Sequence, residues 1–351
     1  MVESGTIEQS LPGLEAMTPQ TDLEVGRAIA LAPQKRLMLF SGRSNPDLAQ
    51  RIAAHLDIEL GSVNLKTFPN GETYCRYEES VRGADMFIVQ TACEPVDRSL
   101  VELLIMINGA RLASAKRITA VVPWYFYARQ DKKSRPREPI SARLVADMLQ
   151  AAGADRVLTM DLHAGQVQGF FHIPVDHMTA VPMFAQYVRD LNLKAPVAVV
   201  SPDTGRTKLA GKFAEMIGGD LVVLNKERPA HNVARVTALI GDVEGKVAVM
   251  TDDVVDTAGT LVAGAAALKE AGALKIYACA THGLFNGPAL GRIAESEIDK
   301  LIVTDTVPVD PLAKPDNIEV LTVAGILAET IQNVFSDDSV SAIFAGENQL
   351  F

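Results

Sequence analysis

Short apolar runs alternate with amphipathic segments along most of the chain, and this alternation constrains the fold more than any other feature of the sequence. Strands are expected at residues 36–40, 63–68, 85–90, 117–125, 156–161, 197–200, 221–224, 247–251, 275–280 and 300–303. Helices are expected at residues 46–56, 98–115, 140–152, 182–191, 208–217, 258–271 and 323–334. Strands that are apolar throughout and separated by helices are typical of parallel sheets covered on both faces. The pattern therefore predicts an α/β protein.

The series of strands and helices runs through twice, which predicts two similar α/β domains. We expect a first domain over residues 36–180 and a second over residues 181–351, each long enough to bury its own core. Residues 1–35 differ from both, because several acidic residues precede the first basic residue, Arg27, and the pattern does not fit a secretory signal. We expect a mostly disordered extension there, with a helix near residues 21–32.

Composition argues against several classes of partner. The 33 Lys and Arg against 43 Asp and Glu give a formal net charge of −10, which disfavours non-specific binding to nucleic acid or to an anionic membrane. No apolar run approaches the roughly 18 residues of a membrane span. The three cysteines, Cys75, Cys93 and Cys279, match neither a disulfide framework nor a zinc site, so a reducing cytoplasm is expected.

Residues 247–260, VAVMTDDVVDTAGT, predict a phosphate-binding turn. An apolar strand leads into the adjacent carboxylates Asp252 and Asp253, and a small-residue turn from Asp256 precedes the next helix. The unpaired amides of a first helical turn bind anions, and Gly259 lets the backbone approach a ligand closely. Carboxylates repel phosphate, so we expect them to bind sugar hydroxyls or a metal ion. The stretch indicates a phosphorylated sugar held end to end; the alternative is an ordinary turn with solvated acids.

A cationic loop, YARQDKKSRPREPIS, follows the apolar run at residues 117–125. Its cations are Arg129, Lys132, Lys133, Arg135 and Arg137. Trp124, Tyr125 and Tyr127 come straight off the apolar strand, so the base of the loop is expected to be anchored. A local basic cluster in an acidic chain calls for a specific anion, and a mobile lid over a polyphosphate meets that need. The alternatives are a solvated surface loop and a nucleic-acid patch.

Two further pairs and one single acid are weak signals when each is taken alone. Asp161 and His163 end a strand, and alternation points both side chains to one face. Asp203 also follows a strand and could complete a hard-metal site, because Mg²⁺ takes few protein ligands when phosphates provide the rest. Lys226 and Arg228 can face one side of an extended segment and neutralise a transferring phosphoryl group, although such a pair is commonly surface charge. Neither a Walker A loop nor a dinucleotide fingerprint is present.

Together these motifs resemble one family, the ribose-phosphate diphosphokinases, also called phosphoribosyl diphosphate synthetases. The resemblance covers nearly all of residues 37–344. Its motifs are SNPDLAQRIA, FPNGE, ESVRG, ELLIMI, YARQDKK, EPISARLVA, DLHAGQVQGFF, SPDTG, NKERP, DDVVDTAGT and SVSAIF. The stretch DDVVDTAGT alone indicates only the wider phosphoribosyltransferase fold, whereas its combination with YARQDKK, DLHAGQVQGFF and NKERP is specific.

The resemblance implies two phosphoribosyltransferase-like domains, each a mostly parallel sheet flanked by helices. It implies transfer of the diphosphoryl group of Mg·ATP to the anomeric hydroxyl of D-ribose 5-phosphate, which gives 5-phospho-α-D-ribose 1-diphosphate and AMP. The implied site residues are Lys226 and Arg228 for catalysis; Phe68, Asn70, Gly71, Glu72, Arg129 and Gln130 for ATP; Arg228, Asp252, Asp253, Asp256, Thr257, Ala258, Gly259 and Thr260 for ribose 5-phosphate; and His163 and Asp203 for Mg²⁺. Ser80, Arg82 and Ser339 are implied regulatory contacts. A homohexamer is also implied, in which residues 68–72 serve a neighbouring active site.

The chain departs from the family pattern at two notable positions. His172 stands where Asp is usual, and Arg206 stands where SPD is commonly followed by Gly-Gly, so a basic side chain is expected near the sugar phosphate. Two other functions compete with active catalysis. A non-catalytic, synthetase-associated regulatory subunit typically loses the lid and the phosphate cradle, and a phosphoribosyltransferase has no need of YARQDKK. Both motifs are intact here, which favours the active enzyme.

Overall fold

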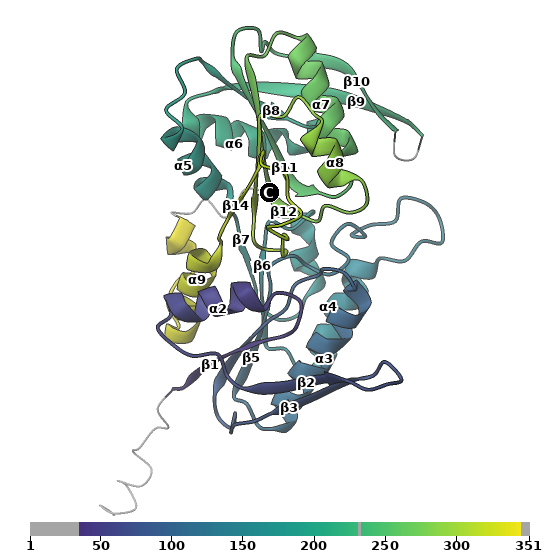
Figure 1. Ribbon diagram of the computed structural model, residues 1–351. Helices are drawn as coiled ribbons and strands as arrows, with labels where there is room; N and C mark the ends of the chain where they lie inside the picture. Colours follow the sequence, from purple (N-terminus) through teal and green to yellow (C-terminus); the bar gives the residue numbers. More distant parts are fainter. Residues whose placement is uncertain (1–34, 231–232, 345–351) are drawn as a thin grey trace, which may run out of the picture. The chain divides into compact units, whose positions relative to one another are not determined.

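The computed structural model describes residues 35–230 and 233–344 of the chain. By its internal contacts the chain divides into residues 1–35 and residues 36–351, and the description below concerns the second unit (Figure 1). The disorder expected of the N-terminal extension, and the helix expected near residues 21–32, lie outside the described residues.

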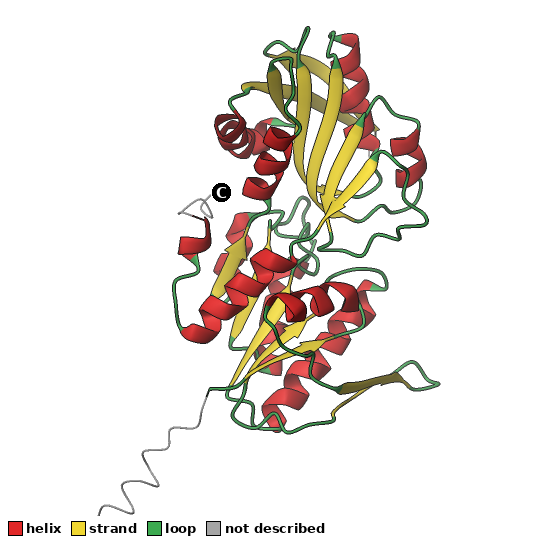
Figure 2. Ribbon diagram, turned by 60° about the vertical axis from the view of Figure 1, so that its left-hand side comes forward, coloured by secondary structure: helices red, strands yellow, loops and turns green. Residues whose placement is uncertain are grey.

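The first sheet is five-stranded and parallel, in the order β1-β4-β5-β6-β7. Its strands are β1 (Leu37–Ser41), β4 (Asp85–Val89), β5 (Arg117–Val122), β6 (Arg156–Met160) and β7 (Val175–Met178). Helices α2 (Pro46–His55), α3 (Val96–Leu112) and α4 (Ser141–Ala152) connect these strands, and β2 (Val63–Thr67) pairs with β3 (Thr73–Tyr77) in a separate antiparallel hairpin. Figure 2 shows the helices flanking the sheet.

The second sheet is seven-stranded, in the order β10-β9-β8-β11-β12-β13-β14, and only the β9–β10 pair is antiparallel. Its strands are β8 (Val197–Ser201), β9 (Asp220–Ala230), β10 (Val233–Ile240), β11 (Val247–Val255), β12 (Lys275–Gly283), β13 (Lys300–Thr304) and β14 (Ile318–Leu321). The helices of this half are α5 (Val181–Asp190), α6 (Thr207–Ile217), α7 (Gly259–Glu270) and the short α8 (Ala289–Ala294). The predicted α/β class with mostly parallel sheets is confirmed.

Local sequence rules account for the helix that follows β1. Pro46 occupies the first turn of α2, and the side chain of Asn45 accepts a hydrogen bond from the amide of Leu48 at 3.3 Å. Asparagine satisfies an amide that would otherwise lack a partner, and proline has no amide to satisfy. The predicted start of α2 is therefore confirmed.

The strands that sequence reasoning missed are β3, β7, β10 and β14, together with helix α8. Three of these strands lie at the edges of the two large sheets, and β3 belongs to the two-stranded hairpin. An edge strand buries less surface than a central one, so its sequence carries a weaker apolar signal. The prediction that β9 ends at Leu224 was also wrong, because the strand continues through polar residues to Ala230.

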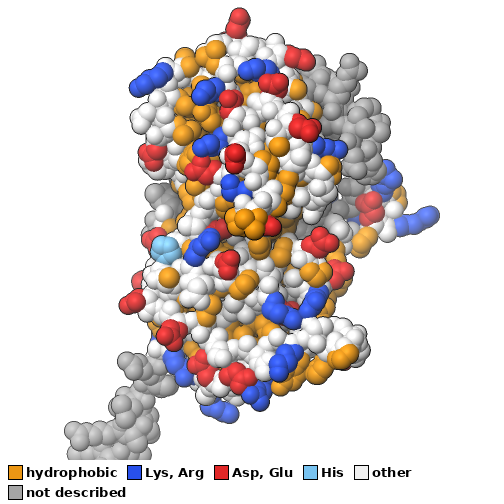
Figure 3. All heavy atoms as spheres, in the orientation of Figure 1, with side chains coloured by type: hydrophobic (Ala, Val, Ile, Leu, Met, Phe, Trp, Pro, Cys, Tyr) orange, Lys and Arg blue, Asp and Glu red, His pale blue; other side chains and the backbone are white. Residues whose placement is uncertain are grey.

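The surface carries charges of both signs. Figure 3 shows acidic and basic side chains interspersed over the visible face. Among the described residues, no helix has both the length and the apolar character that crossing a membrane requires.

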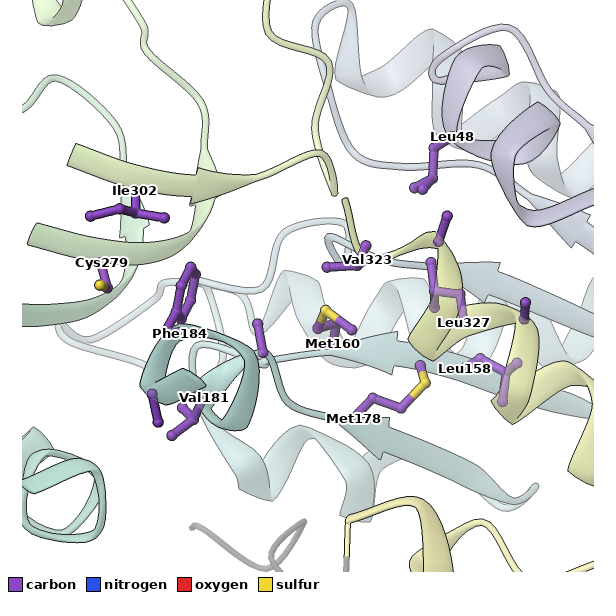
Figure 4. Packing of buried hydrophobic residues seen from close by; sticks show 14 of the residues in the cluster. Leu48, Leu158, Met160, Met178, Val181, Phe184, Cys279, Ile302, Val323 and Leu327 are labelled. Carbon is purple, nitrogen blue, oxygen red and sulfur yellow. The ribbon is translucent and has the colours of Figure 1, made fainter. Parts of the chain in front are cut away.

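The last helix, α9 (Ala324–Ser336), returns from the second sheet to the first. It packs against α2, and the side chain of Arg117 donates to the carbonyl of Val334 and to Asp337, each at 3.0 Å. Figure 4 shows Leu327 of α9 close to Leu158 of β6 in an apolar cluster that extends to the second sheet. Residues from both predicted domains thus share one core cluster, and the boundary expected near residue 180 stays a prediction.

Candidate active site

Several predicted site residues meet where the carboxyl ends of the two sets of strands approach each other. Arg129 follows β5, His163 follows β6, and the acidic stretch lies at the end of β11. The contacts between the halves include two at this point: His163 Nδ1 lies 2.6 Å from Asp253 Oδ2, and Arg129 pairs with Asp256. Ligands of open α/β sheets bind outside the carboxyl ends of strands. The fold thus builds one candidate site from distant parts of the chain.

The turn between β11 and α7 presents helix amides without a side-chain cap. Ala258 has a left-handed φ of 59°, and α7 begins at Gly259 with no side-chain hydrogen bond at its N-terminus. Such amides lack intrahelical partners and attract anions. Arg292 Nη1 donates to the carbonyl of Thr257 at 2.9 Å, and a Cβ on Gly259 would lie 3.4 Å from that nitrogen. Arg292 therefore holds the turn at the start of α7.

The adjacent acids Asp252 and Asp253 have different surroundings because side chains alternate along β11. Asp253 is 3 % exposed; burial alone would raise its pKa, but the hydrogen bond from His163 and the charge of Arg206 outweigh burial and lower it. The side chain of Asp252 is 23 % exposed, and burial together with the charge of Asp253 raises its pKa well above the ordinary value. Asp253 is the settled anion of the pair, and Asp252 is the more accessible acid.

From its position in the sequence, Arg206 was expected near the turn between β11 and α7, but its guanidinium is not free there. Its Nη2 is 2.7 Å from Asp253 Oδ1, and its Nε is 3.5 Å from Asp252 Oδ1. The same Nη2 donates to the carbonyl of His163 at 3.3 Å. The acid pair therefore engages the guanidinium, and the expectation of a basic side chain near the sugar phosphate stays a prediction.

The metal ligands expected from the sequence are only partly arranged. The carboxylate of Asp253 fixes the His163 ring through Nδ1, and no partner of Nε2 occurs among the described residues. A carboxylate behind one ring nitrogen is the usual support of a metal-binding histidine. Asp203 Oδ1 accepts from the amides of Gly205 and Arg206 at 2.9 and 3.2 Å. Within the described ranges, no group of three or more His, Cys, Asp or Glu is arranged to hold a metal ion.

Asp161 does not share a face with His163, contrary to the alternation argument. The strand ends at Met160, and Asp161 adopts a φ of 36°, so strand alternation no longer applies. Its Oδ2 accepts hydrogen bonds from the amide of Ala180 at 2.8 Å and from Thr281 Oγ1 at 2.6 Å. Asp161 therefore ties β6 to β12 beneath the site.

The cationic loop has the anchored base that the sequence predicted. Trp124 and Tyr125 are buried, whereas the five cations of the loop are exposed. Arg129 and Gln130 border a cavity of about 1080 Å³, whose other walls come from residues 92–96, 284–287 and 307–308. Cavities of this size hold ligands much larger than a metal ion.

Other implied residues are not joined to this site by the described contacts. Lys226 and Arg228 lie on β9, and their side chains are outside the described part of the structure. Residues 68–72 form the turn of the β2–β3 hairpin, where Phe68 is 47 % exposed and Gly71 has a φ of 93°. These assignments remain predictions.

The residues implied in regulation are exposed. The carbonyls of Ser80 and Arg82 accept hydrogen bonds from Arg36, and the carbonyl of Ser339 accepts one from Asn333. His172 lies 3.4 Å from Arg143 through its Nε2. Arg36 thus links Ser80 to Arg82, and none of these contacts joins either of them to Ser339.

Sequence reasoning missed two residues that hold the turn between β11 and α7. Asn286 Nδ2 donates to Asp256 Oδ1 at 2.8 Å, and Arg292 holds the carbonyl of Thr257. Both follow β12, whose sequence runs directly into LFNG before α8. That Asn-Gly turn after an apolar strand was the available signal.

The fold and the site define the phosphoribosyltransferase-like class of α/β proteins. Residues 37–153 match the model described as the N-terminal domain of ribose phosphate pyrophosphokinase, and residues 221–345 match the phosphoribosyl synthetase-associated domain. The chain belongs to the ribose-phosphate pyrophosphokinase family and is an enzyme of that type.

Relatives support this assignment over most of the chain. A ribose-phosphate pyrophosphokinase of Caldanaerobacter subterraneus is 51 % identical over 308 residues, which cover 88 % of this chain and 98 % of the relative. One from Clostridium acetobutylicum is 47 % identical over 314 residues, covering 89 % and 98 % respectively. The crystal structure of phosphoribosylpyrophosphate synthetase from Mycobacterium smegmatis is 45 % identical, with a TM-score of 0.82, and covers 86 % of this chain and 100 % of that one.

Proposed function

We propose that, in the reaction of this family, the turn at residues 256–260 and the acid pair bind the sugar, and the cationic loop binds ATP. The chain transfers the diphosphoryl group of ATP to the anomeric hydroxyl of D-ribose 5-phosphate. The hydroxyl oxygen bonds to the β-phosphorus while the bond to the α,β-bridging oxygen breaks, so AMP leaves with the electron pair and the hydroxyl proton is lost. The observation that carries the proposal is the Arg129–Asp256 contact, which brings the cationic loop to the uncapped turn of α7.

The sugar half of the site is the turn and the acid pair. The amides of residues 257–260, with the hydroxyls of Thr257 and Thr260, bind the 5-phosphate. The acid pair, Asp252 and Asp253, forms the side of the site that receives the ribose hydroxyls, and Asp256 lies between the turn and Arg129. The acid pair precedes the turn in sequence and is not part of it. Backbone amides, which donate hydrogen bonds, therefore bind the phosphate, and carboxyl oxygens, which accept them, bind the hydroxyls.

The ATP half is the cationic loop and the cavity beside it. Arg129 and Gln130 contact ATP, and the exposed cations that follow them close over the polyphosphate. We assign residues 68–72, including Phe68, Asn70, Gly71 and Glu72, to the adenine of a neighbouring subunit in a homohexamer. The exposure of Phe68 supports this assignment, because a large exposed aromatic side chain at a hairpin turn suits a partner surface.

The donor set suits Mg²⁺ with its remaining ligands supplied by phosphate. His163 Nε2 and the carboxylate of Asp203 would hold the ion, and when bound it would neutralise charge on the transferring group. The Asp253 carboxylate keeps the His163 ring in the orientation that presents Nε2.

Lys226 and Arg228 supply the cations of the transition state. Charge develops on the oxygens around the transferring phosphorus, and a fixed cation there lowers the barrier. The proposed reaction needs no covalent nucleophile from the protein, because in-line displacement depends on positioning and charge neutralisation.

Two finer assignments complete the proposal. Ser80, Arg82 and Ser339 bind a regulatory anion. The enzyme works in the cytoplasm, and the three free cysteines support a reducing compartment. A relative from Arabidopsis thaliana that is 49 % identical is named as chloroplastic, so location differs within the family.

The experiment follows phosphorus directly. The protein is incubated with Mg²⁺, ATP and ribose 5-phosphate, and ³¹P NMR monitors the products. A diphosphate attached to the anomeric oxygen should appear as the ATP signals fall. A phosphate monoester there instead would contradict diphosphoryl transfer, and product formation only with a nucleobase and phosphoribosyl diphosphate would favour a phosphoribosyltransferase.

A further inference from the structure

Arg206 occupies an enclosed position beneath the proposed sugar site. It closes the short 3₁₀ turn Thr204–Arg206, directly before α6, and its side chain is only 14 % exposed. Its guanidinium contacts three groups at once: the carboxylates of Asp253 and Asp252 and the carbonyl of His163. A planar guanidinium with five donors can fix several acceptors in one geometry, which a lysine cannot do.

The contacts leave one carboxylate oxygen of the acid pair open. Both oxygens of Asp253 are engaged, Oδ1 by Arg206 and Oδ2 by His163. Asp252 Oδ1 accepts the amide of Asp253 at 2.9 Å and faces Arg206 Nε, while Oδ2 has no partner among the described residues. Because Asp253 is also 3 % exposed, the open acceptor for an incoming hydroxyl is Asp252 Oδ2.

The acid pair itself calls for a nearby cation. Two adjacent carboxylates on a buried strand repel each other, and one of them is almost fully enclosed, so a nearby cation is needed to hold both in place. Arg206 provides that cation from the turn before α6, outside the β11 segment that carries the acids.

We propose that Arg206 is a positioning residue for ribose 5-phosphate, which acts by holding Asp252 and Asp253 in the geometry that receives the ribose hydroxyls. Asp253 is then a support beneath the site, and Asp252 is the residue that touches the sugar. The proposal rests on the proposed function, because it takes the acid pair as the ribose site. It concerns binding of the sugar before ATP or metal arrives.

The test measures ribose 5-phosphate binding by calorimetry to the full chain without Mg²⁺ or ATP. Arg206→Gln should weaken binding by roughly ten-fold to a hundred-fold, since a hydrogen-bonded charge is lost. Arg206→Lys should recover part of the loss. Lys208→Gln is the matched control, because Lys208 is an exposed cation in the first turn of α6, two residues after Arg206. Steady-state kinetics should show a raised KM for ribose 5-phosphate, with KM for ATP changed less than about two-fold.

Two results would overturn the proposal. Unchanged binding in Arg206→Gln would remove the positioning role, and tighter binding would show that the arginine blocks the site instead. Thermal unfolding of each variant distinguishes a specific loss of sugar binding from a general loss of fold, which would weaken the binding of both substrates. Asp252→Asn distinguishes the two levels: normal sugar binding in that variant contradicts the proposed ribose site itself, whereas weakened binding there with normal binding in Arg206→Gln contradicts only the role of Arg206.

Discussion

The central strands β5 and β11 occupy comparable positions in the two sheets, but the segments that follow them differ in length and charge. β5 lies between β4 and β6, and residues 123–140 separate it from α4; β11 lies between β8 and β12, and only residues 256–258 separate it from α7. The first segment exposes five cations on an aromatic base, whereas the second offers backbone amides beside acids. Equivalent places in the two sheets therefore carry two different kinds of candidate phosphate-binding group.

The difference has a physical consequence for each substrate. Amides at the start of a helix are fixed by the fold, so the short turn suits one phosphate in one orientation. Cations on long side chains reach a polyphosphate and adapt to it, but they are exposed and their attraction is screened by salt. We infer that the sugar is held by a preformed turn and ATP by a loop that adjusts around it.

The largest effect is expected from a residue in neither region. Lys226→Ala should lower kcat by about a thousand-fold, because a transition-state cation is removed. Ribose 5-phosphate binding should stay close to normal. Single-turnover kinetics measure the change, with the exposed Lys269→Ala on α7 as control. Near-normal turnover would take Lys226 out of the catalytic step.

The acid pair should affect the sugar alone. Asp252→Asn should raise KM for ribose 5-phosphate by about a hundred-fold and change KM for ATP little, because the open carboxylate oxygen becomes a weaker acceptor. Initial rates with each substrate varied in turn provide the measurement, and exposed Asp242→Asn in the same half is the control. Equal losses for both substrates would erase the division between the two regions.

The cationic loop should show the reverse pattern. Arg129→Ala should raise KM for ATP by about ten-fold, while the free energy of unfolding changes by less than about 1 kcal/mol, because the Arg129–Asp256 pair is half exposed. Arg143→Ala is a matched control, since it breaks another exposed pair, with Asp147. If ATP kinetics do not change, the loop does not bind the nucleotide.

The smallest effect concerns the pH dependence of stability, and it arises from two buried histidines, His177 of β7 and His282 of β12. Burial lowers the pKa of His177 from 6.5 to about 4, and burial also lowers the pKa of His282. The unfolded imidazole takes up a proton as pH falls below 6.5 and the folded one does not until about 4, so stability is complete above 6.5 and declines below it.

Urea unfolding at pH 7.5 and pH 5.5 should reveal a loss of about 1 kcal/mol attributable to His177. His177→Gln should make the decline shallower, and His55→Gln, at an exposed position, should leave it as it is. An identical decline in His177→Gln would mean that other groups carry the pH dependence.

The sequence predicted the parts of the molecule that are buried on both sides. Strands such as β4, buried at every position, and helices such as α2, with its Asn45 cap, follow from local rules. Edge strands such as β10 and β14 do not, because their stability comes from a neighbour that the local pattern does not reveal. The return of α9 to α2 could not be predicted either, since it joins the two ends of the described chain.

The same limit applies to the site. Residues 247–260 indicated a phosphate cradle because the strand, acids and turn are contiguous. The engagement of Arg206 by Asp253, and the failure of Asp161 to join His163, depend on how β8, β6 and β11 are brought together. Short-range patterns identified candidate ligand-binding residues that are contiguous in sequence. The contacts between residues far apart in sequence depend on the three-dimensional fold.

The most direct test of the account is the nucleotide product. Purified protein is supplied with Mg²⁺, ATP and ribose 5-phosphate, and nucleotides and sugar phosphates are separated over a time course. The division into a sugar turn and a polyphosphate loop serving diphosphoryl transfer predicts AMP and phosphoribosyl diphosphate in equal amounts. Formation of ADP instead would mean transfer of the γ-phosphoryl group and would contradict the account.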